Sequence, residues 1–189
     1  MPIVVVGDEQ DDRPVEIERW LKLADDVLTA ERVGEDVEVN VIYVNERTMA
    51  ELNERFLGKS GPTDVLSFPI DEGPADSGRV PDNGGVGPGS MSPTDTETVS
   101  MLGDVVICPL VAEHNAPSHA GTYVDELALL LVHGILHLLG MDHSDDDEAA
   151  VMEARERELL EQFYKTIPSS AWEQRGPAPE TEPGEEAPR

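Results

Sequence analysis

The chain has 189 residues, of which 39% are hydrophobic, and this length and apolar content predict one domain with a hydrophobic core of its own. The lone Cys108 excludes an internal disulfide, is expected to pack as a small core residue, and fits a reducing cytoplasm. The longest apolar stretch, 127–132, is too short to span a bilayer, and the apolar start at 3–6 lacks the basic residues of a signal peptide, so neither a membrane span nor export is expected.

Strand-like and helix-like patterns alternate through the first half of the chain. An amphipathic helix is predicted over 14–30, with Pro14 at its start, and a second helix begins near residues 45–48. Short runs of β-branched residues, bounded by turn-forming residues, predict strands. These strands are expected at 3–6, 37–43, 65–68 and 104–108.

Two segments have too few apolar residues to form a hydrophobic core. Residues 71–100 are rich in Gly, Pro, Ser and Asp, and we predict a disordered insertion there. Residues 167–189 are rich in Pro and Glu, and we predict an unstructured acidic tail. The folded domain is therefore expected to span residues 1–166, with the insertion inside it.

The last third of this domain is predicted to be helical. Residues 123–139 are apolar nearly all round, which is typical of a buried central helix. Ser144 is expected to cap a final helix that runs to Tyr164. Together these elements predict an α+β single domain, in which a small mixed sheet of about four strands packs with helices.

Three of the five histidines have the spacing H-x3-H-x5-H, and they are His133, His137 and His143. On a helix, His133 and His137 lie one turn apart on one face. A continuing helix would carry His143 about 15 Å along the axis from His133, so the chain must turn back, and Gly140 suits a left-handed stop. Three neutral imidazoles with an open fourth position predict a catalytic zinc site, with one Zn²⁺ per chain, at the end of the central helix.

The same spacing matches the signature H-E-x-x-H-x-x-G-x-x-H of zinc peptidases, with Gly140 in register. However, Gly134 stands where that signature needs the glutamate that serves as general base. Peptide hydrolysis is therefore the second candidate activity.

The stretch HGILHLLGMDH at 133–143 resembles the HGxLHLxGxDH signature of the YbeY family, the bacterial single-strand-specific endoribonucleases of ribosomal RNA maturation. Two blocks upstream resemble that family in the same order, and the likeness covers about residues 1–165. They are PTDVLSFP at 62–69, preceded by Leu52-Asn53 and Gly58-Lys59, and LGDVVIC at 102–108. Many members have an arginine just before the Gly-Lys pair, thought to bind RNA or act in catalysis, whereas this chain has Leu57.

The resemblance implies a zinc-dependent endoribonuclease that matures the 3′ end of small-subunit ribosomal RNA and acts in ribosome quality control. Its implied partners are ribosomal RNA and the small ribosomal subunit or its proteins, without DNA or membrane. A third candidate function is a non-catalytic ribosome-assembly factor in which zinc only holds the fold.

Beyond a zinc-bound water, the residue pattern assigns no general base. Asp142 adjoins His143 and is a candidate either to orient an imidazole or to form a turn, and Asp104 is a further catalytic candidate. Lys59 and Ser67 are candidate substrate-binding residues. The two other histidines are expected at the surface, and they are His114 and His119.

The charge balance is unusual for a protein that binds RNA. The chain has 13 basic and 40 acidic residues, a net charge of −27, and −19 remains after the insertion and the residues from 166 onward are set aside. The acidic balance predicts that RNA is recognised by its shape or through a partner more than by overall electrostatic attraction. It also resembles adaptation to very high salt, where the Debye length falls to about 3 Å and repulsion is screened.

Overall fold

A four-stranded mixed sheet forms the centre of the computed structural model, which describes residues 1–70 and 99–173. The strand order is β1-β2-β4-β3; β1, β2 and β4 are parallel, and β3 runs antiparallel to β4. The strands are β1 (Ile3–Asp8), β2 (Val37–Tyr43), β3 (Val65–Pro69) and β4 (Ser100–Ile107). The predicted α+β domain with a small mixed sheet is confirmed.

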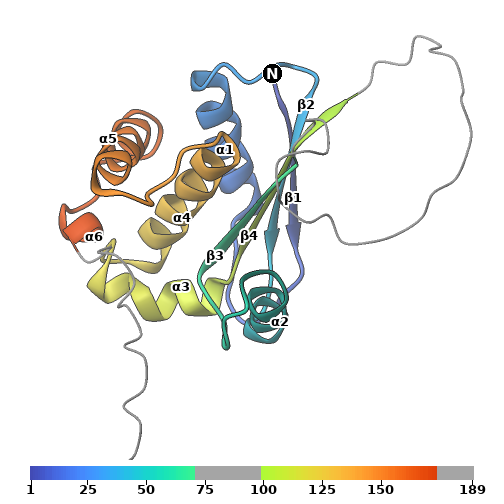
Figure 1. Ribbon diagram of the computed structural model, residues 1–189, viewed down its shortest axis with the longest axis vertical. Coiled ribbons are helices and arrows are strands. Elements are labelled where there is room, and N and C mark those ends of the chain that lie inside the picture. Colours follow the sequence, from blue (N-terminus) through green and yellow to red (C-terminus); the bar gives the residue numbers. More distant parts are fainter. Residues whose placement is uncertain (71–98, 174–189) are drawn as a thin grey trace, which may run out of the picture.

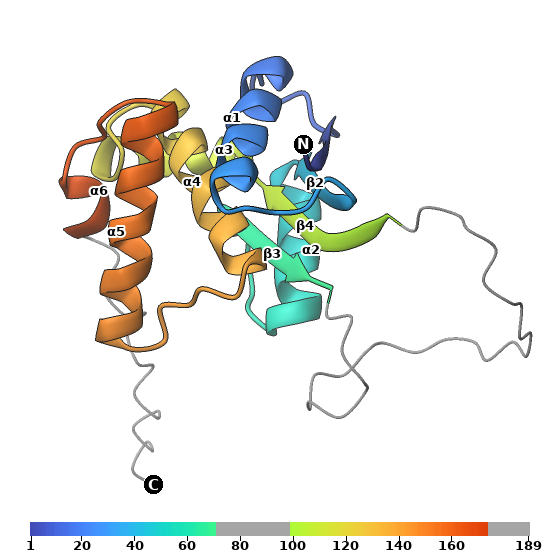
Figure 2. The same cartoon turned by 90° about the horizontal axis from the view of Figure 1, so that it is seen from above.

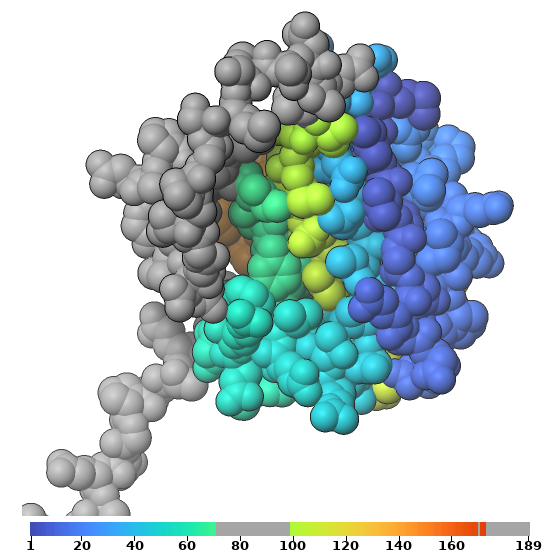
Figure 3. All heavy atoms as spheres, turned by 90° about the vertical axis from the view of Figure 1, so that its right-hand side faces the viewer, coloured from blue at the N-terminus to red at the C-terminus, as the bar shows by residue number. Residues whose placement is uncertain are grey.

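Helices cover the two faces of the sheet unequally (Figures 1 and 2). α1 (Ile17–Ala30) and α4 (Tyr123–Leu138) pack on one face, and α5 (Asp146–Phe163) packs on the outer side of α4. α2 (Glu46–Leu57) lies across one end of the opposite face, where Figure 3 shows the strands side by side. The short elements are α3 (Pro109–Asn115), the 3₁₀ turn η1 (Ala116–Ser118) and α6 (Ser170–Glu173).

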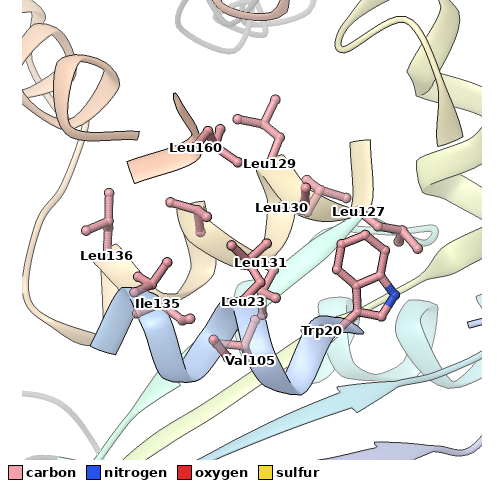
Figure 4. Packing of buried hydrophobic residues seen from close by; sticks show 14 of the residues in the cluster. Trp20, Leu23, Val105, Leu127, Leu129, Leu130, Leu131, Ile135, Leu136 and Leu160 are labelled. Carbon is pink, nitrogen blue, oxygen red and sulfur yellow. The ribbon is translucent and has the colours of Figure 1, made fainter. Parts of the chain in front are cut away.

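Alternation along the strands builds the main core. Val105 and Ile107 of β4 point toward α1 and α4, because successive side chains of a strand face opposite sides. Figure 4 shows Trp20 and Leu23 of α1 packed with the leucines of α4 and with Val105. α4 has more buried residues than any other described helix, and each fully buried leucine contributes roughly 1.5–3 kcal/mol of burial free energy.

α4 is buried without a break from Asp125 to Leu136, which confirms the prediction of a central helix apolar on all sides. Its first turn is capped by Thr122, whose side chain accepts a hydrogen bond from the backbone N–H of Asp125. Within the two described ranges of the chain, no helix is both long and apolar enough to cross a membrane.

Two boundaries in the first part of the chain were predicted wrongly. The first helix begins at Ile17 and not at Pro14, because Glu16 has non-helical dihedral angles and serves as the N-cap. The fourth strand begins at Ser100, four residues before the predicted start, because β2 pairs with β4 from Ser100 onward. Ser100 therefore belongs to the sheet and not to the predicted insertion, while residues 71–98 lie outside the described residues.

Two further predictions near the C-terminus need correction. The final helix is capped by Asp145, whose carboxylate accepts from the backbone N–H of Glu148, and not by Ser144. The domain also extends past residue 166, because Ala171 and Trp172 of α6 are buried in the core cluster. The predicted tail therefore starts too early at 167, and residues 174–189 lie outside the described part.

Candidate metal centre

The last turn of α4 and the tight turn after it bring the three histidines together. Gly140 has φ +86°, a left-handed conformation that glycine adopts without steric cost. The backbone N–H of Gly140 donates to the carbonyl of His137, and that of Met141 donates to the carbonyl of Leu136. This pair of hydrogen bonds is the Schellman helix stop, and it reverses the chain as the position of Gly140 predicts.

The geometry of the cluster suits one small cation. One ligand atom from each of His133, His137 and His143 lies within 4.8 Å of the others. The Nε2 atoms of His133 and His137 are 3.0 Å apart, close to the roughly 3.3 Å expected for two ligands of a tetrahedral ion with bonds of about 2.0–2.1 Å. The ring centroids are separated by 4.5 to 5.5 Å. The three rings could thus hold one metal ion.

The protonation state of His137 also suits a ligand. Burial, followed by the neighbouring imidazoles of His133 and His143, lowers the pKa of His137 to about 4. Its ring is therefore neutral at physiological pH. A neutral imidazole has the free lone pair that a metal ion needs.

A buried carboxylate orients the first histidine. Nδ1 of His133 lies 2.6 Å from Oε1 of Glu156, an α5 residue whose side chain is fully buried. The other carboxylate oxygen, Oε2, accepts a hydrogen bond of 2.7 Å from Nε1 of Trp172. Because Nδ1 of His133 faces an acceptor, Nε2 would be the nitrogen available to a metal ion, which is the usual arrangement beside zinc.

Sequence reasoning missed Glu156. A signal was present, since Glu156 interrupts the buried stripe of α5 formed by Met152, Leu159 and Leu160. A charged residue on the apolar side of a helix is rarely buried unless it has a partner. The helical spacing of α5 could therefore have identified the position, although not its partner.

Gly134 allows α4 to approach the sheet closely. A Cβ atom at this position would lie 2.5 Å from Cγ1 of Val105 and 3.3 Å from Oγ of Ser67. Position 134 therefore faces the strands and not the histidine cluster. The glutamate that a zinc peptidase carries here has no room.

The two acidic candidates do not contact the imidazole rings. Asp142 is exposed, and its carboxylate accepts from Oγ of Ser144 and from the backbone N–H of His143. These hydrogen bonds lower the pKa of Asp142, which makes it a weak base. The carboxylate of Asp104 accepts a hydrogen bond of 2.8 Å from the side-chain amide of Asn40. Asp104 and Val105 are successive strand residues, so their side chains point to opposite faces of the sheet, and the fold does not bring Asp104 to the histidine cluster.

The two substrate-binding candidates also lie apart from each other. Oγ of Ser67 donates to the carbonyl of Gly134 (3.1 Å), so Ser67 ties β3 to α4 next to His133. Lys59 is exposed after α2, which packs on the other face of the sheet, and Leu57 at the end of that helix is also exposed.

The remaining cysteine and histidines have other surroundings. Cys108 lies in a second cluster of buried apolar residues, together with Val44, Met49, Leu66 and Val106, and burial raises the pKa of its thiol. It is not among the residues whose ligand atoms converge with those of the three histidines. His114 is exposed, as predicted. His119 was predicted at the surface, but it is half-buried, with Nδ1 3.1 Å from Oε1 of the buried Glu126.

The fold and the site together define a small α+β domain with a three-histidine cluster that could hold a metal ion. Residues 5–164 match the family model described as Endoribonuclease YbeY. The chain belongs to this family.

Two relatives that carry this name are similar over most of their length. The Endoribonuclease YbeY of Thermobifida fusca is 41% identical, over 82% of this chain and 90% of the relative. That of Salinispora tropica is 40% identical, over 80% of this chain and 90% of the relative. A solution structure of a Thermotoga maritima protein is 28% identical and covers 86% of this chain and 89% of its own, with a TM-score of 0.53.

Proposed function

We propose that this protein is a metal-dependent endoribonuclease that cleaves single-stranded RNA, with His133, His137 and His143 as the ligands of one zinc ion. The convergence of three ring nitrogens within 4.8 Å, in a chain of the endoribonuclease YbeY family, supports this proposal. Imidazole nitrogen suits zinc, whereas magnesium and calcium prefer oxygen ligands.

A zinc ion held by these three histidines alone would have one further coordination position for water or substrate, as catalytic zinc sites do. When bound, a zinc ion there supplies Lewis acidity toward a phosphodiester oxygen and toward water. The protein's own residues orient this chemistry: Glu156 holds the ring of His133, and the turn at Gly140 returns His143 to the cluster. Hydrolysis by water and attack by the 2′-hydroxyl of the RNA are both compatible with such a site.

The proposed substrate is precursor ribosomal RNA, at the 3′ end of the small-subunit RNA, in the cytoplasm, with a further role in ribosome quality control. Membership of the endoribonuclease YbeY family supports an RNA substrate. The net charge of −27 opposes binding to phosphate by bulk attraction. We therefore propose that the small ribosomal subunit or one of its proteins presents the RNA to the site.

Cleavage of precursor small-subunit RNA by His143→Ala tests this proposal. His143 is the exposed member of the cluster, so its removal disturbs the fold least. His114→Ala removes an exposed histidine outside the cluster and is the matched control. We expect the control to cleave like the wild type, alone or within subunits, and His143→Ala to lose cleavage. Equal cleavage by both variants would reject the site.

Two alternatives predict other outcomes. A zinc peptidase would cleave a casein-like substrate in a chelator-sensitive way, but the contact between position 134 and Val105 disfavours it because the general base has no room. An assembly factor with structural zinc would unfold in His137→Ala, and its metal-loaded wild type would not cut RNA. The catalytic proposal predicts a folded His137→Ala protein without cleavage.

A further inference from the structure

We infer that Trp172 and Glu156 form a positioning relay for His133, through which the C-terminal segment 167–172 sets the metal affinity of the site. This inference deepens the proposed function and rests on the metal site proposed there. It assigns a role to residues that lie beyond the part of the chain matched by the family model, which ends at residue 164.

The hydrogen bonds of the relay use both oxygens of one carboxylate. Oε1 of Glu156 faces Nδ1 of His133 at 2.6 Å, and Oε2 accepts from Nε1 of Trp172 at 2.7 Å. With both oxygens engaged, the carboxylate cannot rotate without breaking a hydrogen bond. The indole thus fixes the carboxylate, and the carboxylate fixes the plane of the imidazole that would bind the ion.

The segment also keeps water away from the carboxylate. Ile167, Ala171 and Trp172 are all buried in the main core cluster, and the exposed fraction of Glu156 is 0%. The guanidinium of Arg157 lies 4.5 Å from the centre of the Trp172 ring and helps to hold it in place. A hydrogen bond to a charged group is stronger in such a dry environment than in water, so Glu156 makes the imidazole of His133 a better ligand.

The contact of Trp172 is more than a by-product of burying an indole. Trp20, the other tryptophan, is also fully buried, yet its Nε1 has no hydrogen-bond partner among the described residues. A tryptophan of this core can therefore be accommodated without a partner for its N–H. The hydrogen bond from the indole N–H of Trp172 to the carboxylate of Glu156 is therefore a specific contact and not a requirement of burial.

The test measures zinc affinity in the full chain, by competition with a chromophoric chelator. Trp172→Phe removes the N–H and keeps an aromatic ring, whereas Glu156→Gln removes the charge and keeps the volume. Trp20→Phe makes the same change in a buried tryptophan outside the relay and is the matched control. We expect both relay variants to bind zinc about 10–100-fold more weakly than the wild type, and the control to bind like the wild type.

Two further readouts separate positioning from folding. The visible absorption spectrum of the Co²⁺-loaded protein reports ligand geometry and is expected to change in the relay variants only. The melting temperature of the metal-free protein reports packing and is expected to fall in both Trp172→Phe and Trp20→Phe, and further in Trp172→Phe, because that variant also removes a hydrogen bond to a buried carboxylate.

Each failure has a distinct meaning. Folded relay variants with wild-type zinc affinity would overturn the relay and leave the proposed metal site intact. Loss of folding in both relay variants would assign them a structural role and also overturn the relay. If the wild type bound no stoichiometric zinc, the proposed function itself would fail, and the relay with it.

Discussion

The close approach of α4 to the sheet at Gly134 can be tested by adding one methyl group. In Gly134→Ala the new Cβ would lie 2.5 Å from Cγ1 of Val105, whereas apolar carbons normally pack at about 3.5–4.0 Å. Val105 is fully buried and β-branched, so its side chain cannot easily rotate away. Either the helix or the strand must move.

The expected magnitude combines two opposing effects. Replacing glycine by alanine within a helix stabilises it by about 1 kcal/mol, and overpacking a well-packed core costs typically about 1–3 kcal/mol. Because the contact is at least about 1 Å too short, we use the upper cost, which gives a net loss of about 2 kcal/mol in the free energy of unfolding. The melting temperature should fall by about 4–8 °C.

Urea denaturation of Gly134→Ala, Val105→Ala and the double variant provides the measurement. Val105→Ala removes the two methyl groups nearest to the added Cβ, so the double variant should be more stable than the sum of the single effects predicts. The coupling should be about 1–3 kcal/mol. If Gly134→Ala were instead more stable than the wild type by about 1 kcal/mol, helix propensity alone would decide and the packing argument would be wrong.

Four further outcomes are expected. Asn45→Ala removes the side-chain cap on the N–H of Thr48 and should lower the free energy of unfolding, measured by urea denaturation, by about 1 kcal/mol. An unchanged denaturation midpoint would contradict this expectation. Burial alone would raise the pKa of Asp125, but hydrogen bonds from Lys165 and Tyr164 hold that pKa below its ordinary value. This stabilisation is present above about pH 4 and lost as the pH falls through the native pKa, so Lys165→Met should destabilise the protein at neutral pH and not near pH 2. A chelator should lower the melting temperature of zinc-loaded wild type and leave the metal-free protein unchanged, since an ion at about 100 times its Kd adds about 2.7 kcal/mol of stability. The net charge of −27 predicts a higher melting temperature in molar KCl than in dilute buffer, and an equal or lower value would reject adaptation to high salt.

The sequence by itself determined the three-histidine cluster. His133 and His137 are one helical turn apart, and Gly140 provides the left-handed turn that returns His143, so the whole arrangement lies within 11 consecutive residues. Local spacing and backbone conformation suffice for such an arrangement, because no distant segment has to be placed. For the same reason the start of α2, expected near residues 45–48, was predicted correctly.

Only the tertiary structure decided what surrounds these histidines. Glu156 reaches His133 from another helix, 23 residues further along the chain, and Trp172 reaches Glu156 from a segment that reads as a disordered tail. The sheet separates Asp104 from the histidines and places Gly134 against Val105. Such outcomes depend on which faces of separate elements pack together, and helical or strand periodicity within one element does not specify its partner in another.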